Sequence, residues 1–140
     1  MNTLASRSAR HWLLPLLMVG TAGCARAPQV LPAGPWRATL QMPGGDLPFG
    51  LEVAAAAPGT KTHPPVYLLN GTDREQIDEI TIDGNRVTML MPGFKNRIDA
   101  TLEGERLAGT LTMVKSGAEE QKIPFQAQHG QTWRFTPPAA

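Results

Sequence analysis

Residues 97–113 read RIDATLEGERLAGTLTM, and this stretch decides the fold of the chain. Apolar and polar residues alternate on both sides of its central Glu103-Gly104-Glu105, with the apolar positions at Ile98, Ala100, Leu102, Leu107, Leu111 and Met113. Alternation with a period of two is typical of a strand that buries one face, and a short turn makes consecutive strands antiparallel. The stretch therefore predicts two antiparallel strands that share one apolar face.

The same alternation recurs on both sides of this pair. It covers five further runs, at residues 36–42, 47–53, 77–82, 87–91 and 123–127, and residues 65–69 are expected to form a short apolar strand. Turn signals such as Asn70-Gly71 and Asp83-Gly84-Asn85 separate the runs. The step from Ile77 to Ile80 breaks the alternation and predicts a bulge near Asp78-Glu79. The chain is thus expected to form about eight strands joined by seven turns.

These strands need a partner for their apolar face, and the sequence offers no amphipathic helix to cover it. We therefore expect an all-β domain, an antiparallel up-and-down meander closed into a barrel of the lipocalin-like kind, with a β-sandwich as the alternative. The inward positions are interpreted as a packed core rather than the lining of an apolar ligand cavity. They are Trp36, Leu40, Met42, Phe49, Leu51, Met89, Met91, Leu102, Leu111, Met113 and Phe125.

The amino terminus has the pattern of an export signal. Basic residues precede a short apolar run at residues 12–19, which ends in Thr21-Ala22-Gly23-Cys24. This ending resembles the bacterial lipobox, so we expect a lipoprotein signal peptide over 1–23, lipidation (palmitate and related chains) on Cys24 and a tether over 24–34. Ala25 favours the outer over the inner membrane, on the periplasmic side. The alternative is an ordinary secretory signal cut near Ala25 or Ala27.

Composition and motifs offer little sign of catalysis. The chain has 13 Lys and Arg residues, 12 Asp and Glu residues and one Cys, so a basic surface for nucleic acid and a Cys-x-x-Cys pair are both missing from the sequence. His63 and His129 are expected to be exposed loop residues. The adjacent acids Asp78-Glu79 and Glu119-Glu120 are expected on loops or the polar outer face. We therefore predict no catalytic, metal or cofactor site.

Several motifs resemble the amino-terminal domain of periplasmic TlpA-type thiol:disulfide reductases. They are GPWRATL (34–40), GGDLPFGLE (44–52), Asn70-Gly71 with Glu75, MPGF (91–94), LEGERLAG (102–109) and IPFQA (123–127). In that family a thioredoxin domain with a Cys-x-x-Cys pair follows and does the chemistry. The resemblance thus implies an accessory domain over 35–135, followed by a linker-like Pro/Ala tail over 136–140, and no activity for this chain.

Three functions follow as expectations. The first is a non-enzymatic cell-envelope lipoprotein, held to a membrane by its lipid, whose β-domain contacts an envelope protein. The second is the amino-terminal fragment of a thiol:disulfide reductase that lacks its catalytic domain. The third is a carrier of a small apolar ligand. Trp133 and Phe135 are expected to add a last short strand or to plug one end of the barrel.

Overall fold

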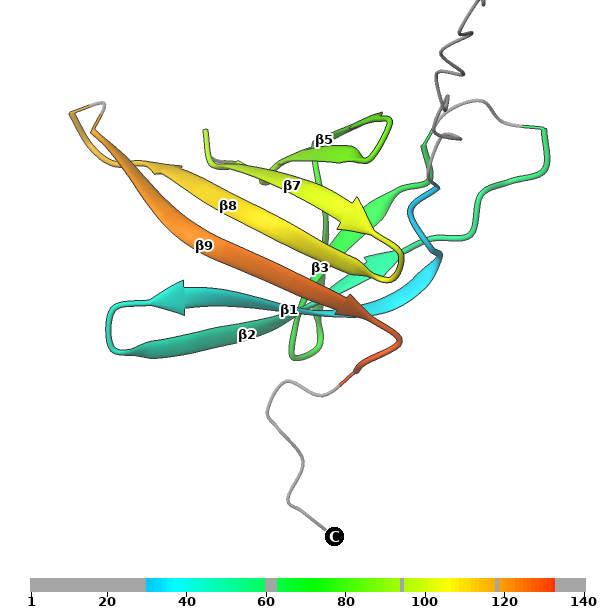
Figure 1. Ribbon diagram of the computed structural model, residues 1–140, viewed down its shortest axis with the longest axis horizontal. Coiled ribbons are helices and arrows are strands. Elements are labelled where there is room, and N and C mark those ends of the chain that lie inside the picture. Colours follow the sequence, from blue (N-terminus) through cyan, green and yellow to red (C-terminus); the bar gives the residue numbers. More distant parts are fainter. Residues whose placement is uncertain (1–29, 60–62, 94, 118, 133–140) are drawn as a thin grey trace, which may run out of the picture.

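Figure 1 shows the computed structural model of the chain, which describes residues 30–59, 63–93, 95–117 and 119–132. Within these ranges the regular structure is all β, and no helix that could span a membrane is present. Cys24, the signal segment, Trp133, Phe135 and the Pro/Ala tail lie outside the described residues. The strands are β1 (Gly34–Met42), β2 (Gly45–Val53), β3 (Val66–Asn70), β4 (Asp73–Gln76), β5 (Glu79–Asp83), β6 (Arg86–Leu90), β7 (Arg97–Glu103), β8 (Arg106–Val114) and β9 (Glu120–His129).

The strands form one continuous sheet in the order β4-β3-β2-β1-β9-β8-β7-β6-β5, and every neighbouring pair is antiparallel. Neighbours in the chain are neighbours in the sheet, except that β1 pairs with β9 and β4 does not pair with β5. This arrangement confirms the predicted up-and-down meander. The sheet curls on itself (Figure 1), so a sandwich of two separate sheets is not the arrangement adopted.

The two edge strands, β4 and β5, are joined by Ile77 and Asp78 alone. Eight successive antiparallel pairings separate them in the sheet, so β4 and β5 run in the same direction. They are therefore two halves of one bent strand, of which the first pairs with β3 and the second with β6. Since the two linking residues reach at most about 11 Å, the sheet edges meet at this point and the sheet becomes barrel-like.

The bend accounts for the difference between eight expected and nine observed strands. In place of the predicted bulge, the chain changes its partner strand between Gln76 and Glu79, from β3 to β6. The Ile77 amide donates to the Val66 carbonyl oxygen (2.9 Å), and the Gly93 amide donates to Asp78 Oδ2 (3.4 Å). The two linking residues are thus hydrogen-bonded to different parts of the sheet, Ile77 to β3 and Asp78 to the loop after β6. These bonds hold the two edges of the sheet together at the bend.

The first half of the bent strand, β4, was not predicted because Asp73-Arg74-Glu75-Gln76 contains no apolar residue. On its outward face, Arg74 attaches β4 to the neighbouring strands. The guanidinium carbon of Arg74 lies 3.3 Å from the centroid of the Tyr67 ring on β3. The same side chain forms an ion pair with Glu52 (Nε to Oε2, 3.1 Å) on β2. The hydrogen bond to Glu52 raises the pKa of Arg74 above its ordinary value, so the guanidinium that makes this contact stays charged.

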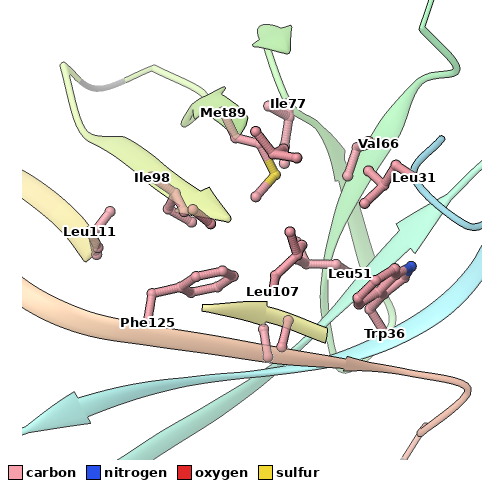
Figure 2. Close-up of a cluster of buried hydrophobic side chains, with 14 of the residues drawn as sticks. Leu31, Trp36, Leu51, Val66, Ile77, Met89, Ile98, Leu107, Leu111 and Phe125 are labelled. Carbon is pink, nitrogen blue, oxygen red and sulfur yellow. The ribbon is translucent and has the colours of Figure 1, made fainter. Parts of the chain in front are cut away.

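The inward side chains form one buried hydrophobic cluster inside the curled sheet, part of which is drawn in Figure 2. Of the eleven predicted core positions, seven are buried and the other four, Met42, Phe49, Met91 and Met113, are half-buried against them. Leu31 is also buried (3% exposed), although it falls in the stretch 24–34 that the sequence assigned to the tether. The remaining buried apolar residues outside the predicted set are Ala38, Val53, Val66, Ile77, Val87, Ile98, Ala100, Leu107, Ile123 and Ala127.

Candidate functional site

The described chain reaches the barrel through residues 30–33, which we call the lead-in segment. Val30 is 76% exposed, whereas Leu31 is buried beside Trp36 and Val66 at one end of the core (Figure 2). The Trp36 indole Nε1–H donates to the Pro32 carbonyl oxygen at 3.0 Å. The lead-in segment is the described part of the chain that lies closest in sequence to Cys24, and it enters the fold at this end of the barrel.

This barrel end is closed by His129, the last residue of β9. Its Nδ1 lies 3.2 Å from Glu105 Oε1, and its Nε2 lies 2.9 Å from the Ala33 carbonyl oxygen. The imidazole ring packs against Trp36, with 5.1 Å between the ring centroids. We call these four residues the end cluster, because they join the lead-in segment, the β7–β8 turn and β9.

Three further hydrogen bonds to main-chain carbonyl oxygens connect the segments that carry the end cluster. The His129 amide donates to the Glu105 carbonyl oxygen (2.9 Å), and the Gly130 amide donates to the Pro35 carbonyl oxygen (2.8 Å). The side-chain Nε2 of Gln128 donates to the same Glu105 carbonyl oxygen (3.0 Å). The imidazole is therefore held by the main chain in its place between Glu105 and Ala33.

The two histidines of the folded part have different surroundings. His63 is exposed on the connection between β2 and β3, as expected. His129 was also expected on an exposed loop, but it continues β9 and its side chain is only 20% exposed. The physical reason is register, because His129 is paired with Trp36 and thus follows Ile123, Phe125 and Ala127 on the inward face.

The two adjacent acidic pairs, Asp78-Glu79 and Glu119-Glu120, lie at turns and at the first residues of strands. Asp78 accepts from the Gly93 amide, and Glu79 begins the edge strand β5 with an exposed side chain. The Glu119 carbonyl oxygen accepts from the Lys115 amide (2.9 Å), which closes the β8–β9 turn, and Glu120 begins β9. Among the described residues, no three His, Cys, Asp or Glu side chains are grouped so that they could hold a metal ion.

An apolar cleft of about 240 Å³ opens near the β1–β2 hairpin. Leu47 and Phe49 continue the inward alternation of β2, but burial falls along the strand from Leu51 (2% exposed) to Leu47 (48% exposed). Phe49 packs on Phe125 with 6.3 Å between ring centroids, so the core forms the floor of the cleft. The lining residues are Leu40, Leu47, Pro48, Phe49, Leu68, Leu69, Asn70 and Met91.

A polar cleft of about 310 Å³ lies on the outer face of β1, β8 and β9. Arg37 and Arg106 are both paired with Gln128, so their Cα atoms lie about 10 Å apart in one row across the sheet. Arg106 Nη2 donates to Gln126 Oε1 (3.0 Å), and Arg37 Nη1 donates to Thr39 Oγ1 (3.4 Å). The other lining residues are Gln41, Asp46, Ala127 and Gln131.

Sequence reasoning missed the polar cleft, since outward Gln and Thr residues on a strand look the same whether they bind a partner or only water. Its guanidinium and amide groups can donate to carboxylate and carbonyl oxygens, and the apolar cleft can receive a small apolar group. The two clefts are therefore the candidate sites for recognition on the described surface. Searches against protein-family models, curated proteins and solved structures find no match to this chain.

Proposed function

We propose that this chain is a cell-envelope lipoprotein, anchored by a lipid on Cys24, whose barrel-like domain acts as a non-catalytic interaction module. The observation that carries the proposal is the order of features at the amino terminus: basic residues, a short apolar run, and small residues directly before the one cysteine. A thioether-linked diacylglycerol supplies two acyl chains, which is enough for stable membrane anchoring.

The fold is compatible with such an anchor. Leu31, the first buried residue in the described part of the chain, follows Cys24 by 31 − 24 = 7 residues. Seven extended residues reach at most about 25 Å, so the barrel would stand close to the membrane with its lead-in end towards the lipid. Ala25, in place of Asp, favours the outer membrane by analogy with other bacterial lipoproteins.

The interaction role is supported by the polar cleft. Its two arginines and its glutamines lie on the outer face of β1, β8 and β9, the strands at the middle of the sheet. Arginine is enriched at protein interfaces because it combines charge, directed donors and apolar area. The partner proposed here is an envelope protein that presents backbone carbonyl and carboxylate oxygens to this cleft.

The two other functions have less support. The interior in which a ligand would be carried holds the buried hydrophobic cluster, and the apolar cleft, at about 240 Å³, is smaller than most ligand pockets. The relation to TlpA-type reductases stays a prediction. It would be tested by reading the DNA downstream for a Cys-x-x-Cys in a βαβ context.

The anchoring proposal is tested by fractionating cells that express the full chain in the presence of labelled palmitate. The wild-type protein should carry the label and sediment with membranes, whereas Cys24→Ser should lose the label and leave the membrane fraction. Ala27→Ser is the matched control and should behave as wild type. Ala25→Asp should keep the label but move to the inner membrane. Equal labelling of wild type and Cys24→Ser would refute the anchor.

The interaction proposal needs a separate test. A photo-reactive residue at Gln126, inside the polar cleft, should cross-link one envelope protein, and Arg106→Glu should abolish that product. The same probe at Thr88, on the outer face of β6, should give no such product. Cross-linking that is equal at both positions would argue against the cleft. Reduction of a protein disulfide by the purified chain would contradict a non-catalytic role.

A further inference from the structure

We infer that a third cleft, on the outer face of the sheet, is the docking site of the chain's own Trp133, whose indole packs over Gly50 between Arg37 and Leu69. Trp133 lies outside the described residues, so the inference is argued from the cleft and from the residues that lead the chain to it. It concerns a contact within the chain and does not rest on the proposed anchor or partner.

The cleft has a volume of about 220 Å³ and crosses β1, β2 and β3. Gly50 is paired with Arg37 on one side and with Leu69 on the other, and it contributes no side chain between them. A Cβ at Gly50 would lie 2.9 Å from the Cβ of Leu69, so Leu69 stands directly beside the open position. We call this site the Gly50 cleft, and its lining also includes Pro35, Gln131 and Thr132.

Leu69 gives the Gly50 cleft an apolar side on the outer face of the sheet. Leu68 packs against the buried cluster, and successive residues of a strand point to opposite faces, so Leu69 points outward. An apolar side chain in this position gains free energy when another apolar group covers it. The cleft therefore favours an apolar occupant.

The end of β9 leads the chain to the Gly50 cleft. Gly130, directly after the strand, has a φ angle of +77°, which favours glycine, and its amide donates to the Pro35 carbonyl oxygen at 2.8 Å. After this turn, Gln131 and Thr132 line the cleft. Since consecutive Cα atoms are about 3.8 Å apart, Trp133 begins one residue from the lining.

The chemistry of an indole suits both sides of the Gly50 cleft. Its ring offers a large apolar face to Leu69, and it is the aromatic group on which a guanidinium such as that of Arg37 stacks best. A side chain of the same molecule is also present at a high effective concentration, which favours it over a free partner. We therefore assign the cleft to Trp133, on the outer face of the sheet and not at the barrel end.

The test is fluorine NMR of the full chain in detergent, with fluorotryptophan in place of tryptophan. The chain contains three tryptophans, and the signal that Trp133→Phe removes is that of Trp133. The measured quantity is the change in chemical shift between ordinary and heavy water, which is large for a solvated fluorine and small for a buried one. In the wild type the Trp133 signal should change little. Trp36, 1% exposed, should also change little and reports folding in the same spectrum.

Variants test whether the Gly50 cleft is what shields the ring. Leu69→Ser removes the apolar side of the cleft, so the solvent-dependent change of the Trp133 signal should rise to that of free fluorotryptophan. Leu47→Ser is the matched control and should keep the wild-type value, because Leu47 is a 48% exposed leucine outside this cleft. Arg37→Gln removes the guanidinium and should give an intermediate value. If the Trp36 signal shows that Leu69→Ser is unfolded, Arg37→Gln provides the test.

The inference is overturned if the Trp133 signal of the wild type behaves as free fluorotryptophan, or if it is unchanged in folded Leu69→Ser. An equal rise in Leu69→Ser and Leu47→Ser would also overturn it, because the ring would then be shielded by no particular site. Palmitate labelling and cross-linking at Gln126 report the proposed function independently of this signal.

Discussion

Gly109 of β8 lies directly opposite Phe125 of β9, and its missing side chain lets β7 and β8 approach one another closely. A Cβ at Gly109 would overlap the carbonyl oxygen of Asp99 and lie 2.5 Å from the Cα of Ala100. Phe125, 1% exposed, is one of the largest buried side chains on the inward face next to this contact. The pair thus combines a close approach of two strand backbones with one large ring.

We expect Gly109→Ala to lower the free energy of unfolding by at least about 2 kcal/mol, because the obstacle is backbone that cannot move aside like a side chain. Urea denaturation followed by far-UV circular dichroism measures this. Ala108→Ser, at the adjacent exposed position, is the control and should change stability by less than about 0.5 kcal/mol.

The origin of that cost is tested by a double variant. Phe125→Leu should cost about 1 kcal/mol alone, and it should not relieve Gly109→Ala, because the added methyl group meets β7 and not the ring. A double variant that is more stable than Gly109→Ala alone would show that the ring causes the crowding.

The bend between β4 and β5 provides a prediction about closure of the barrel. Ile77 is 4% exposed and Asp78 is exposed, so the side chains of the two linking residues face opposite sides of the curled sheet. Ile77→Ala should cost about 2–4 kcal/mol and increase hydrogen exchange in both β4 and β5, because both edges meet there. Asp78→Ala should change stability little, since its single contact to Gly93 is long and exposed. Equal effects of the two substitutions would refute a closure that depends on the inward side chain.

The apolar cleft leads to a prediction about surface binding. Leu47→Ser should reduce the fluorescence of a bound apolar dye while changing stability by less than about 0.5 kcal/mol, because Leu47 is nearly half exposed. Val30→Ser removes another exposed apolar residue outside the cleft and should leave dye binding unchanged. Dye binding that falls equally in both variants would indicate a nonspecific apolar surface.

Much of the fold could be predicted because its information is local. The alternation in residues 97–113 and the turn glycines determine the hairpins, and Gly71 and Gly104 have the positive φ angles (+66° and +62°) that such turns favour. Closure of the predicted meander brings its first strand beside its last, but the register of β1 on β9, with Leu40 opposite Phe125, could not be predicted. It joins residues far apart in the chain, and nothing in either strand specifies the other.

The candidate site was less accessible to sequence reasoning. His129 could have been placed inward by extending the alternation of Ile123, Phe125 and Ala127 by one more step. Its contacts with Glu105 and Ala33 depend on a turn and a lead-in segment that carry no motif. The polar cleft depends on cross-strand rows, such as Arg37, Gln128 and Arg106, that exist only once the sheet has its register.

The most direct test of the proposed function is mass spectrometry of the amino-terminal peptide of the protein extracted from membranes. The proposal predicts that the mature chain begins at Cys24 and that its sulfur carries a thioether-linked diacylglycerol. A mature chain that begins at Ala25 or Ala27, or an unmodified Cys24, would contradict it.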